Sequence, residues 1–231
     1  MRPPILCGLH LPKVIYRTKS DLNGDIEILK IGKTIKLKVG GISQSINWDS
    51  PSCVKLVWGK VAELLKRETP NLKNVLILGL GGGTMQHLIS HEFQNISIVS
   101  VELDPIMIEI AKKYYDIGSI PGHRVINANA LRVVVEPRRF NLRKNSFGAL
   151  IVDIFIGEDY PDLGESGSFL GAVKELVASG GLVVFNRIYL ESHQADVDNF
   201  IEQISEPFSD VKEEVVAGYT NSDNILVYGR V

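Results

Sequence analysis

Hydrophobic and polar residues alternate along the first part of the chain, and this pattern predicts short, half-buried strands. Ile26 and Ile28 show the alternation, which is typical of antiparallel strands with one covered face. Turn sequences at Asn23-Gly24 and Gly32-Lys33 separate the strands. The predicted strands are Lys13–Thr18, Asp25–Lys30, Thr34–Val39 and Ile42–Ile46. We therefore expect residues 1–48 to form an N-terminal β-hairpin region.

After residue 48 the pattern changes to apolar strands that alternate with amphipathic helices. Ser50 is expected to cap the first helix, with Pro51 at its first position and Thr69-Pro70 at its end. The further predicted strands are Val75–Leu78, Ile96–Val101, Arg124–Asn127, Ala149–Asp153, Leu182–Asn186, Val211–Ala217 and Ile225–Tyr228. The further predicted helices are Thr84–His91, Asp104-Pro105 to about Tyr115, Ala130–Glu136, Ser166–Ala178 and Ser192–Ser205.

This succession predicts a parallel sheet with helices on both faces. The chain closes on two strands joined by a polar turn, which is unusual for a dinucleotide-binding Rossmann fold. It suits the class I S-adenosylmethionine-dependent methyltransferase-like variant, in which a final antiparallel strand inserts beside its neighbour. Residues 49–231 are therefore expected to form one Rossmann-like, nucleoside-binding α/β domain.

Composition narrows the function classes. Hydrophobic residues make up 45% of the 231 residues, and the net charge is -2, so no strong field favours nucleic acid or a membrane. The basic stretch Arg138–Lys144 lacks an aromatic platform and is interpreted as a solvated loop. The two cysteines, Cys7 and Cys53, form neither a disulfide framework nor a zinc motif. The first residues of the chain do not form a convincing signal peptide. Both observations predict a cytoplasmic protein. The histidines show no metal-ligand pattern, so no metal is expected.

The sharpest motif is the glycine-rich loop Gly79–Gly83, between an apolar strand and a helix. Glycines allow a tight turn and close approach of a ligand to the backbone. Gly79, Gly81 and Gly83 are therefore candidates for nucleoside binding. Glu102 follows the next strand, about 20 residues further on, where an acid can accept both ribose hydroxyls.

Two further polar residues follow strands whose carboxyl ends share the same sheet edge. Asn129, followed by Ala130, is placed to hydrogen-bond an adenine edge or simply to cap the next helix. Asp153 ends its strand either as a ligand, as an anchor for a ligand, or as a structural cap.

These residues resemble the spermidine synthase family of polyamine aminopropyltransferases from about Tyr16 onward. The segments that are similar to it are Gly41–Ser45, Val75–His91, Val101–Pro105 and Ala111–Tyr115. The resemblance implies that Glu102, within the acidic motif that also contains Asp104, holds the ribose. It also implies that Asn129 and Ala130 lie at the adenine and that Gln44 lines the pocket.

The chain departs from that family at two carboxylates. Gly82 stands where the family's glycine loop carries an Asp that holds the nucleoside's amino group. Ile156 replaces the second Asp of the family's Asp-Ser-x-Asp segment, whereas Asp153 remains. The following residues look more like divergent spermidine synthase-like proteins. They contain acids that either replace the lost carboxylate or form a solvated loop, namely Glu158, Asp159, Asp162 and Glu165.

Three functions remain open. The first is an aminopropyltransferase that uses decarboxylated S-adenosylmethionine and a polyamine or diamine acceptor, with Asp153 as the group that orients the amine. The second is a methyltransferase that uses intact S-adenosylmethionine and an amine or another nucleophile. The third is a non-catalytic homologue. The resemblance also implies a homodimer formed partly through the N-terminal region.

Overall fold

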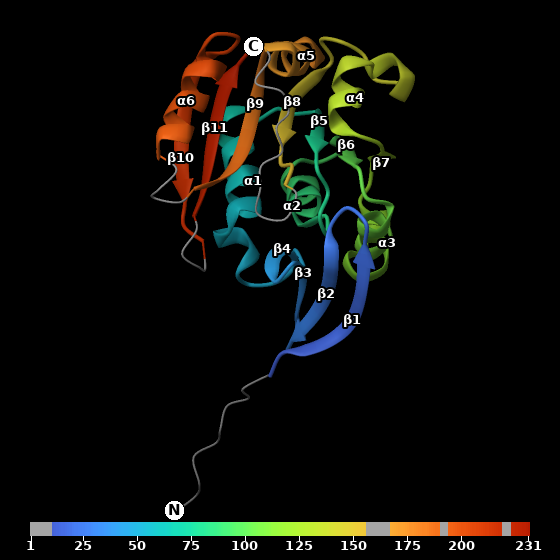
Figure 1. Ribbon diagram of the computed structural model, residues 1–231. Helices are drawn as coiled ribbons and strands as arrows, with labels where there is room; N and C mark the ends of the chain where they lie inside the picture. Colours follow the sequence, from blue (N-terminus) through green and yellow to red (C-terminus); the bar gives the residue numbers. More distant parts are fainter. Residues whose placement is uncertain (1–10, 156–166, 190–193, 219–222) are drawn as a thin grey trace, which may run out of the picture.

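The part of the chain that the structure describes forms two β-sheets (Figure 1). The computed structural model describes residues 11–155, 167–189, 194–218 and 223–231. The smaller sheet is antiparallel, has its strands in sequence order, and consists of β1 (Lys13–Ser20), β2 (Gly24–Ile31), β3 (Thr34–Val39) and β4 (Ile42–Ile46). Its strands match those that the alternating pattern predicted.

The larger sheet has seven strands in the order β10-β11-β9-β8-β5-β6-β7. The strands are β5 (Asn74–Leu78), β6 (Ser97–Glu102), β7 (His123–Asn127), β8 (Phe147–Val152), β9 (Val177–Tyr189), β10 (Ser209–Val216) and β11 (Asp223–Arg230). The strands from β5 to β9 pair in parallel, whereas β11 inserts between β9 and β10 and is antiparallel to both. This arrangement confirms the fold class that the closing hairpin predicted.

Helices cover both faces of the larger sheet (Figure 1). They are α1 (Val57–Glu68), α2 (Thr84–Glu92), α3 (Pro105–Tyr115), α4 (Ala130–Val135), α5 (Gly167–Leu176) and α6 (Gln194–Ser205), with short 3-10 turns at Cys53–Lys55, Ile117–Ser119 and Pro137–Phe140. Side chains alternate between the two faces along each strand. Val75 and Ile77 pack in the core that includes residues of α1, α2 and α3, whereas Leu76 and Leu78 pack with residues of α4, α5 and α6.

The N-terminal sheet packs against the α/β part through apolar side chains. Ile28 and Leu37 are fully buried in the same core cluster as Met107 of α3. Tyr16 and Tyr114 also pack together, with ring centroids 5.4 Å apart. The sheet lies below the carboxyl edge of the larger sheet in Figure 1, which positions it over the predicted site. A domain boundary at residue 48 stays a prediction.

The first helix begins later than Ser50-Pro51 predicted. A 3-10 turn spans Cys53–Lys55, and α1 starts at Val57 after the extended residue Leu56. The Ser50 hydroxyl lies 3.1 Å from the Thr34 hydroxyl, so it contacts the N-terminal sheet and does not cap a helix. The cap prediction was wrong because a tertiary contact competes with local capping.

The predicted helix Ser166–Ala178 ends earlier, and its last two predicted residues belong to the next strand. Helix α5 ends at Leu176, and β9 begins at Val177 and runs through both glycines. Gly180 donates its N–H to the Val231 carbonyl at 2.7 Å. Gly180 has φ 74°, and the pairing of β9 with β8 shifts register between Phe147 and Ala149, so β9 bulges at the glycines. The hydrogen bond to the chain's last residue holds this bulge in the sheet, although glycines usually end a helix. The predicted start of α6 at Ser192 lies outside the described residues.

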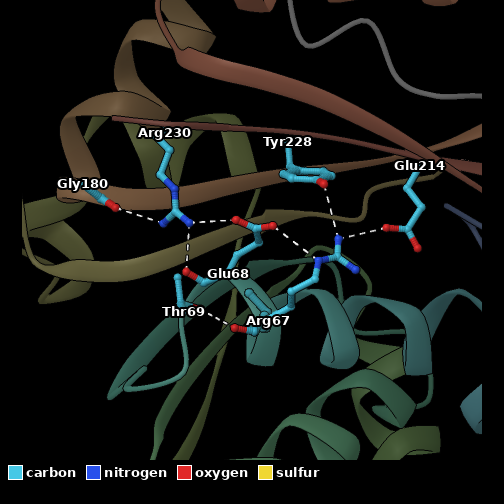
Figure 2. A network of polar contacts seen from close by, with 8 residues as sticks. Arg67, Glu68, Thr69, Gly180, Glu214, Tyr228 and Arg230 are labelled. Carbon is cyan, nitrogen blue, oxygen red and sulfur yellow. Dashed lines mark hydrogen bonds and ion pairs between the residues drawn. The ribbon is translucent and has the colours of Figure 1, made fainter.

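A network of charged residues ties α1 to the C-terminal strands (Figure 2). Arg230 donates to the Glu68 carboxylate at 2.9 Å and to the Glu68 carbonyl at 2.8 Å. Arg67 donates to Glu214 at 3.0 Å and to the Tyr228 hydroxyl at 3.3 Å. The Glu68 side chain is only 17% exposed.

Within the described residues, no helix combines the length and apolar character needed to cross a membrane.

We expect Arg230→Ala to destabilise the protein by about 2 kcal/mol, because one oxygen of the partly buried Glu68 carboxylate and the Glu68 carbonyl lose their charged donor, while Arg67 contacts only the other carboxylate oxygen. Lys60→Ala is the control, since Lys60 and Glu63 form an exposed pair, and a change within about 0.5 kcal/mol is expected. Urea unfolding at pH 7 measures both values. Equal effects would show that the network in Figure 2 contributes no more than a surface ion pair.

Candidate functional site

A cavity of about 660 Å³ opens at the carboxyl ends of β5, β6, β8 and β9, with residues of β3 and β4 on its other side. Parallel α/β sheets bind ligands at this edge. The predicted site residues that line the cavity are Gln44, Gly79, Gly81, Glu102, Asp104, Asn129, Ala130 and Asp153. Gly83 is not part of the lining. It precedes α2, and a side chain there would meet Ile117.

Gly79 and Asp153 lie directly beside each other where β5 and β8 end. Gly79 has φ 111°, and a Cβ on it would collide with the Asp153 carbonyl oxygen. The Asp153 N–H donates to the Leu78 carbonyl, and the Gly79 N–H donates to the Val101 carbonyl, both at 2.8 Å. Only glycine fits this position, and its presence brings the start of the loop against the acid.

Strand β4 lies across the glycine loop and the start of α2. The Gly82 N–H donates to the Ser45 hydroxyl at 2.7 Å, and the Thr84 hydroxyl donates to the Ile46 carbonyl. Gln44 therefore reaches the cavity from a strand that is hydrogen-bonded to the loop. Sequence reasoning did not single out Ser45, although it belongs to the same motif as Gln44.

Gly82 is buried, and nothing larger fits at this position without movement. A Cβ on Gly82 would lie 2.8 Å from the Ser45 Cβ and 3.1 Å from the Tyr115 ring. Gly82 is not among the residues that line the cavity. The acid that spermidine synthases carry at this position, according to the sequence resemblance, therefore has no counterpart here and no free space.

Glu102 ends β6 at the cavity. One of its carboxylate oxygens accepts the Asp104 N–H at 2.8 Å. Burial raises the pKa of the Glu102 carboxyl, the charge of Asp104 raises it further, and backbone N–H donors oppose the shift. A buried carboxylate with a raised pKa is stabilised by additional hydroxyl donors, which suits the predicted contact to ribose hydroxyls.

Asp104 lines the cavity, but its carboxylate already holds structural partners. One oxygen accepts the Ile106 N–H at 2.9 Å and caps α3. The other accepts from the Ser20 hydroxyl at 2.5 Å and from the Asn23 side-chain amide at 2.6 Å. Leu22 and Asn23 also line the cavity. Asp104 thus fastens the β1–β2 turn at the cavity, a role that sequence reasoning missed.

Asn129 precedes α4, and its side-chain oxygen accepts the Arg132 N–H at 3.3 Å. The structure therefore shows the capping role that was one of the two interpretations. Its side-chain NH₂ group has no hydrogen-bond partner in the part of the chain that the structure describes. Contact with an adenine edge stays a prediction, and capping leaves that donor group available for it.

A chain of two asparagines that sequence reasoning missed ends at Asp153. The Asn186 amide on β9 donates to one Asp153 oxygen at 2.7 Å, and the Asn224 amide on β11 donates to the Asn186 oxygen at 3.0 Å. Burial raises the pKa of Asp153 to about 6, and the Asn186 hydrogen bond opposes this shift. Asn186 ended a predicted apolar strand, so a polar residue at that strand end was the available signal.

The described residues contain no cluster of three His, Cys, Asp or Glu side chains placed to hold a metal ion. The absence of a metal stays a prediction. Residues 156–166 lie outside the described residues. The departure at Ile156 and the acids Glu158, Asp159, Asp162 and Glu165 are therefore not placed.

Similarities to known proteins agree with this geometry. A polyamine aminopropyltransferase of Vibrio vulnificus is 30% identical over 117 residues, which cover 51% of this chain and 38% of that protein. An eEF1A lysine and N-terminal methyltransferase homolog of Drosophila melanogaster is 27% identical over 170 residues, which cover 68% of this chain and 24% of that protein. The chain spans at most 55% of the length of the curated relatives that it matches. No protein-family model matches the chain.

Solved structures show the same fold. Spermidine synthase from Thermotoga maritima superposes with a TM-score of 0.74 at 21% identity, covering 94% of this chain and 72% of that one. A spermidine synthase in complex with the transition state analogue AdoDATO gives a TM-score of 0.75 at 20% identity, with 94% and 73% covered. The fold and the cavity define an α/β protein with a class I methyltransferase-type sheet and an N-terminal β-sheet. Within that class the chain is similar in sequence to polyamine aminopropyltransferases and shares the fold of spermidine synthases, which agrees with the resemblance that its motifs indicated.

We expect Asp153→Asn to be more stable than the unchanged protein above pH 6. The pKa of Asp153 in the folded protein is raised from 3.8 to about 6. The folded protein therefore loses stability as the pH rises between these two values. A shift of this size corresponds to about 2–3 kcal/mol, and the advantage of the variant should vanish near pH 3.5. Melting curves from pH 3.5 to 8 measure it, with Asp25→Asn on β2 as the control for removing one charge. An Asp153→Asn variant that is less stable at pH 8 would contradict the expectation.

Gly82→Ala should lower stability by about 1–3 kcal/mol, because Ser45 or Tyr115 must move to admit the methyl group. Gly118→Ala is the matched control, since a Cβ there has nothing within 4 Å. Urea titrations compare the two variants. If both are equally stable, the loop has more room at Gly82 than the structure indicates.

Proposed function

We propose that this protein is a transferase that binds a decarboxylated S-adenosylmethionine-type nucleoside in the cavity and transfers its aminopropyl group to an amine held at Asp153. The observation that carries the proposal is the convergence of eight predicted site residues on one cavity, at the junction of Gly79 and Asp153. The likeness to polyamine aminopropyltransferases supports the same reaction class.

In this proposal the nucleoside lies along the carboxyl edge of the sheet. Gly79 and Gly81 let it approach the backbone, and Glu102 accepts its ribose hydroxyls. Asn129 and Ala130 lie at the adenine, and Gln44 forms the wall that β4 provides. This order along β5, β6 and β7 would leave the sulfonium end of the nucleoside nearest Asp153, because β8 adjoins β5 on the other side.

Asp153 would then prepare the acceptor. An amine is protonated in water and must lose a proton before it can attack. The Asp153 carboxylate accepts that proton, and its pKa of about 6 makes it a stronger base than an exposed Asp. The amine nitrogen forms a bond to the carbon attached to sulfur, the carbon–sulfur bond breaks, and its electron pair stays on a neutral thioether. The main contribution of the protein is alignment of the two reactants.

Methyl transfer from intact S-adenosylmethionine is the second candidate. It is favoured by Gly82, which replaces the Asp of the aminopropyltransferase loop and leaves no space for one. The relatives described as methyltransferases also match a larger share of this chain than the Vibrio protein does. The displacement is the same, with the methyl carbon as the reacting atom. A homodimer, a cytoplasmic location and the non-catalytic alternative stay predictions.

We expect Glu102→Gln to weaken nucleoside binding about tenfold or more, because a charged acceptor of two hydroxyl hydrogen bonds is lost. Glu109→Gln on the exposed side of α3 is the control with the same change of charge. Calorimetric titrations with methylthioadenosine, decarboxylated S-adenosylmethionine and S-adenosylmethionine provide the measurement.

Tighter binding of the decarboxylated form, with aminopropyl product formed from an added amine, would support the first candidate. Tighter binding of the intact form would support methyl transfer. Absence of binding by all three nucleosides would refute both and leave the non-catalytic alternative. Unchanged binding by Glu102→Gln would refute the assigned role of that residue.

A further inference from the structure

The proposed nucleoside does not account for every residue that lines the cavity. Asp153, Asn186 and Asn224 line the cavity from the larger sheet, and Lys36 and Lys38 of β3 line it from the N-terminal sheet. We call these five residues the acceptor region. Because an acceptor must lie next to the reacting carbon, the charges of this region select the acceptor.

Only one carboxylate in the described lining is available to an acceptor. The acids that line the cavity there are Glu102, Asp104 and Asp153. Glu102 has the proposed role at the ribose, and the Asp104 oxygens hold Ser20, Asn23 and the start of α3. One Asp153 carboxylate oxygen accepts a hydrogen bond from the Asn186 amide, and the other oxygen has no hydrogen-bond partner in the described part of the chain. That oxygen can hold a single amine.

The two lysines have no ion-pair partner among the described residues. Both side chains are half-buried, and no carboxylate there lies within 4 Å of either one. Glu27 is the cross-strand neighbour of Lys38, but its carboxylate pairs with Arg17 at 2.7 Å. The β3 side of the cavity is therefore positively charged, and the sulfonium of a donor adds another positive charge.

An acceptor with two ammonium groups fits these charges poorly. Its first ammonium can pair with Asp153, but the second lies in a cavity with two unpaired lysines and a sulfonium. Like charges a few ångströms apart in a partly desolvated site repel measurably. A neutral group has no such cost, and a carboxylate gains attraction from the lysines.

We propose that the acceptor carries one amine, held by Asp153 in the orientation set by Asn186 and Asn224, and that the rest of the acceptor is neutral or anionic and faces Lys36 and Lys38. An aminocarboxylate has this chemistry. This inference rests on the proposed function, because it assumes that the acceptor region adjoins a bound nucleoside. The transfer step is the same as in the proposed function: the nitrogen–carbon bond forms, the carbon–sulfur bond breaks, and the amine proton goes to Asp153.

Three four-carbon probes that differ only in the distal group test the proposal: 1,4-diaminobutane, 1-aminobutane and 4-aminobutanoate. Their binding is measured by calorimetry on the full chain, both saturated with methylthioadenosine and alone. We expect 4-aminobutanoate to bind most tightly and 1,4-diaminobutane most weakly, with about a tenfold span. The Lys36→Glu/Lys38→Glu variant should reverse the order. Lys30→Glu on β2, outside the cavity, should retain it.

The orienting role of Asn186 has its own readout. Its hydrogen bond opposes the raised pKa of Asp153. In Asn186→Ala the midpoint of the pH dependence of amine binding should therefore move to higher pH, whereas general loss of folded protein would lower binding equally at every pH. An unchanged midpoint would overturn the orienting role.

The remaining outcomes separate the two proposals. If methylthioadenosine does not bind, the proposed function fails, and the probe order on the protein alone still decides the inference about the acceptor. If methylthioadenosine binds but 1,4-diaminobutane is the tightest probe, the inference fails and the proposed function stands. The inference also fails if the order of probe affinities is the same in the Lys36→Glu/Lys38→Glu variant as in the unchanged protein. It fails as well if none of the three probes binds at millimolar concentration.

Discussion

The close approach of Gly79 to the Asp153 carbonyl is the constraint on which the rest of the site depends. Strands β5 and β8 are neighbours, and at their ends the backbone of one lies so near the other that no side chain fits at Gly79. This contact places a bare turn, suited to a nucleoside, beside a carboxylate suited to an amine. Both reactants of a group transfer can therefore meet at one point. The positioning comes from backbone geometry, which does not change with side-chain rotamers.

The N-terminal sheet completes the cavity because hydrogen bonds attach it on two sides. Ser45 accepts the Gly82 N–H on one side, and Asp104 holds Ser20 and Asn23 on the other. Each contact satisfies a buried polar group whose loss would be costly. The attachment explains why Gln44 and the lysines of β3 can take part in the same site as the strand ends of the larger sheet.

The electrostatic character of the site differs on its two sides. One side has Glu102, the proposed ribose contact, whose pKa is raised by burial. The other side has Asp153, which accepts from Asn186, itself held by Asn224, and two lysines without an ion pair are among the described lining residues. The buried position of Gly82 removes a carboxylate that would have shifted this balance. In our proposals, donor and acceptor preference both follow from how few carboxylates the described lining leaves available.

The sequence by itself determined the order of strands and helices, the inserted final strand and the residues at the carboxyl edge of the sheet. These features depend on local signals: the period of apolar residues, the glycines after β5, and acids at strand ends. The true start of α1 and the extent of β9 depended on Ser50 meeting Thr34 and on Gly180 pairing with Val231. Both contacts join residues that are distant in the chain, so no local pattern records them.

The same reason separates the site residues that were found from those that were missed. Glu102 and Asp153 follow strands, and their position in the sequence already indicates the shared edge. Asn186 meets Asp153 because β9 pairs with β8, and Asn224 meets Asn186 because β11 inserts beside β9. The lack of space at Gly82 likewise arises from Ser45 and Tyr115, which belong to other elements. Local pattern specifies the elements and their ends, whereas the partners of each polar side chain exist only once distant segments have packed together.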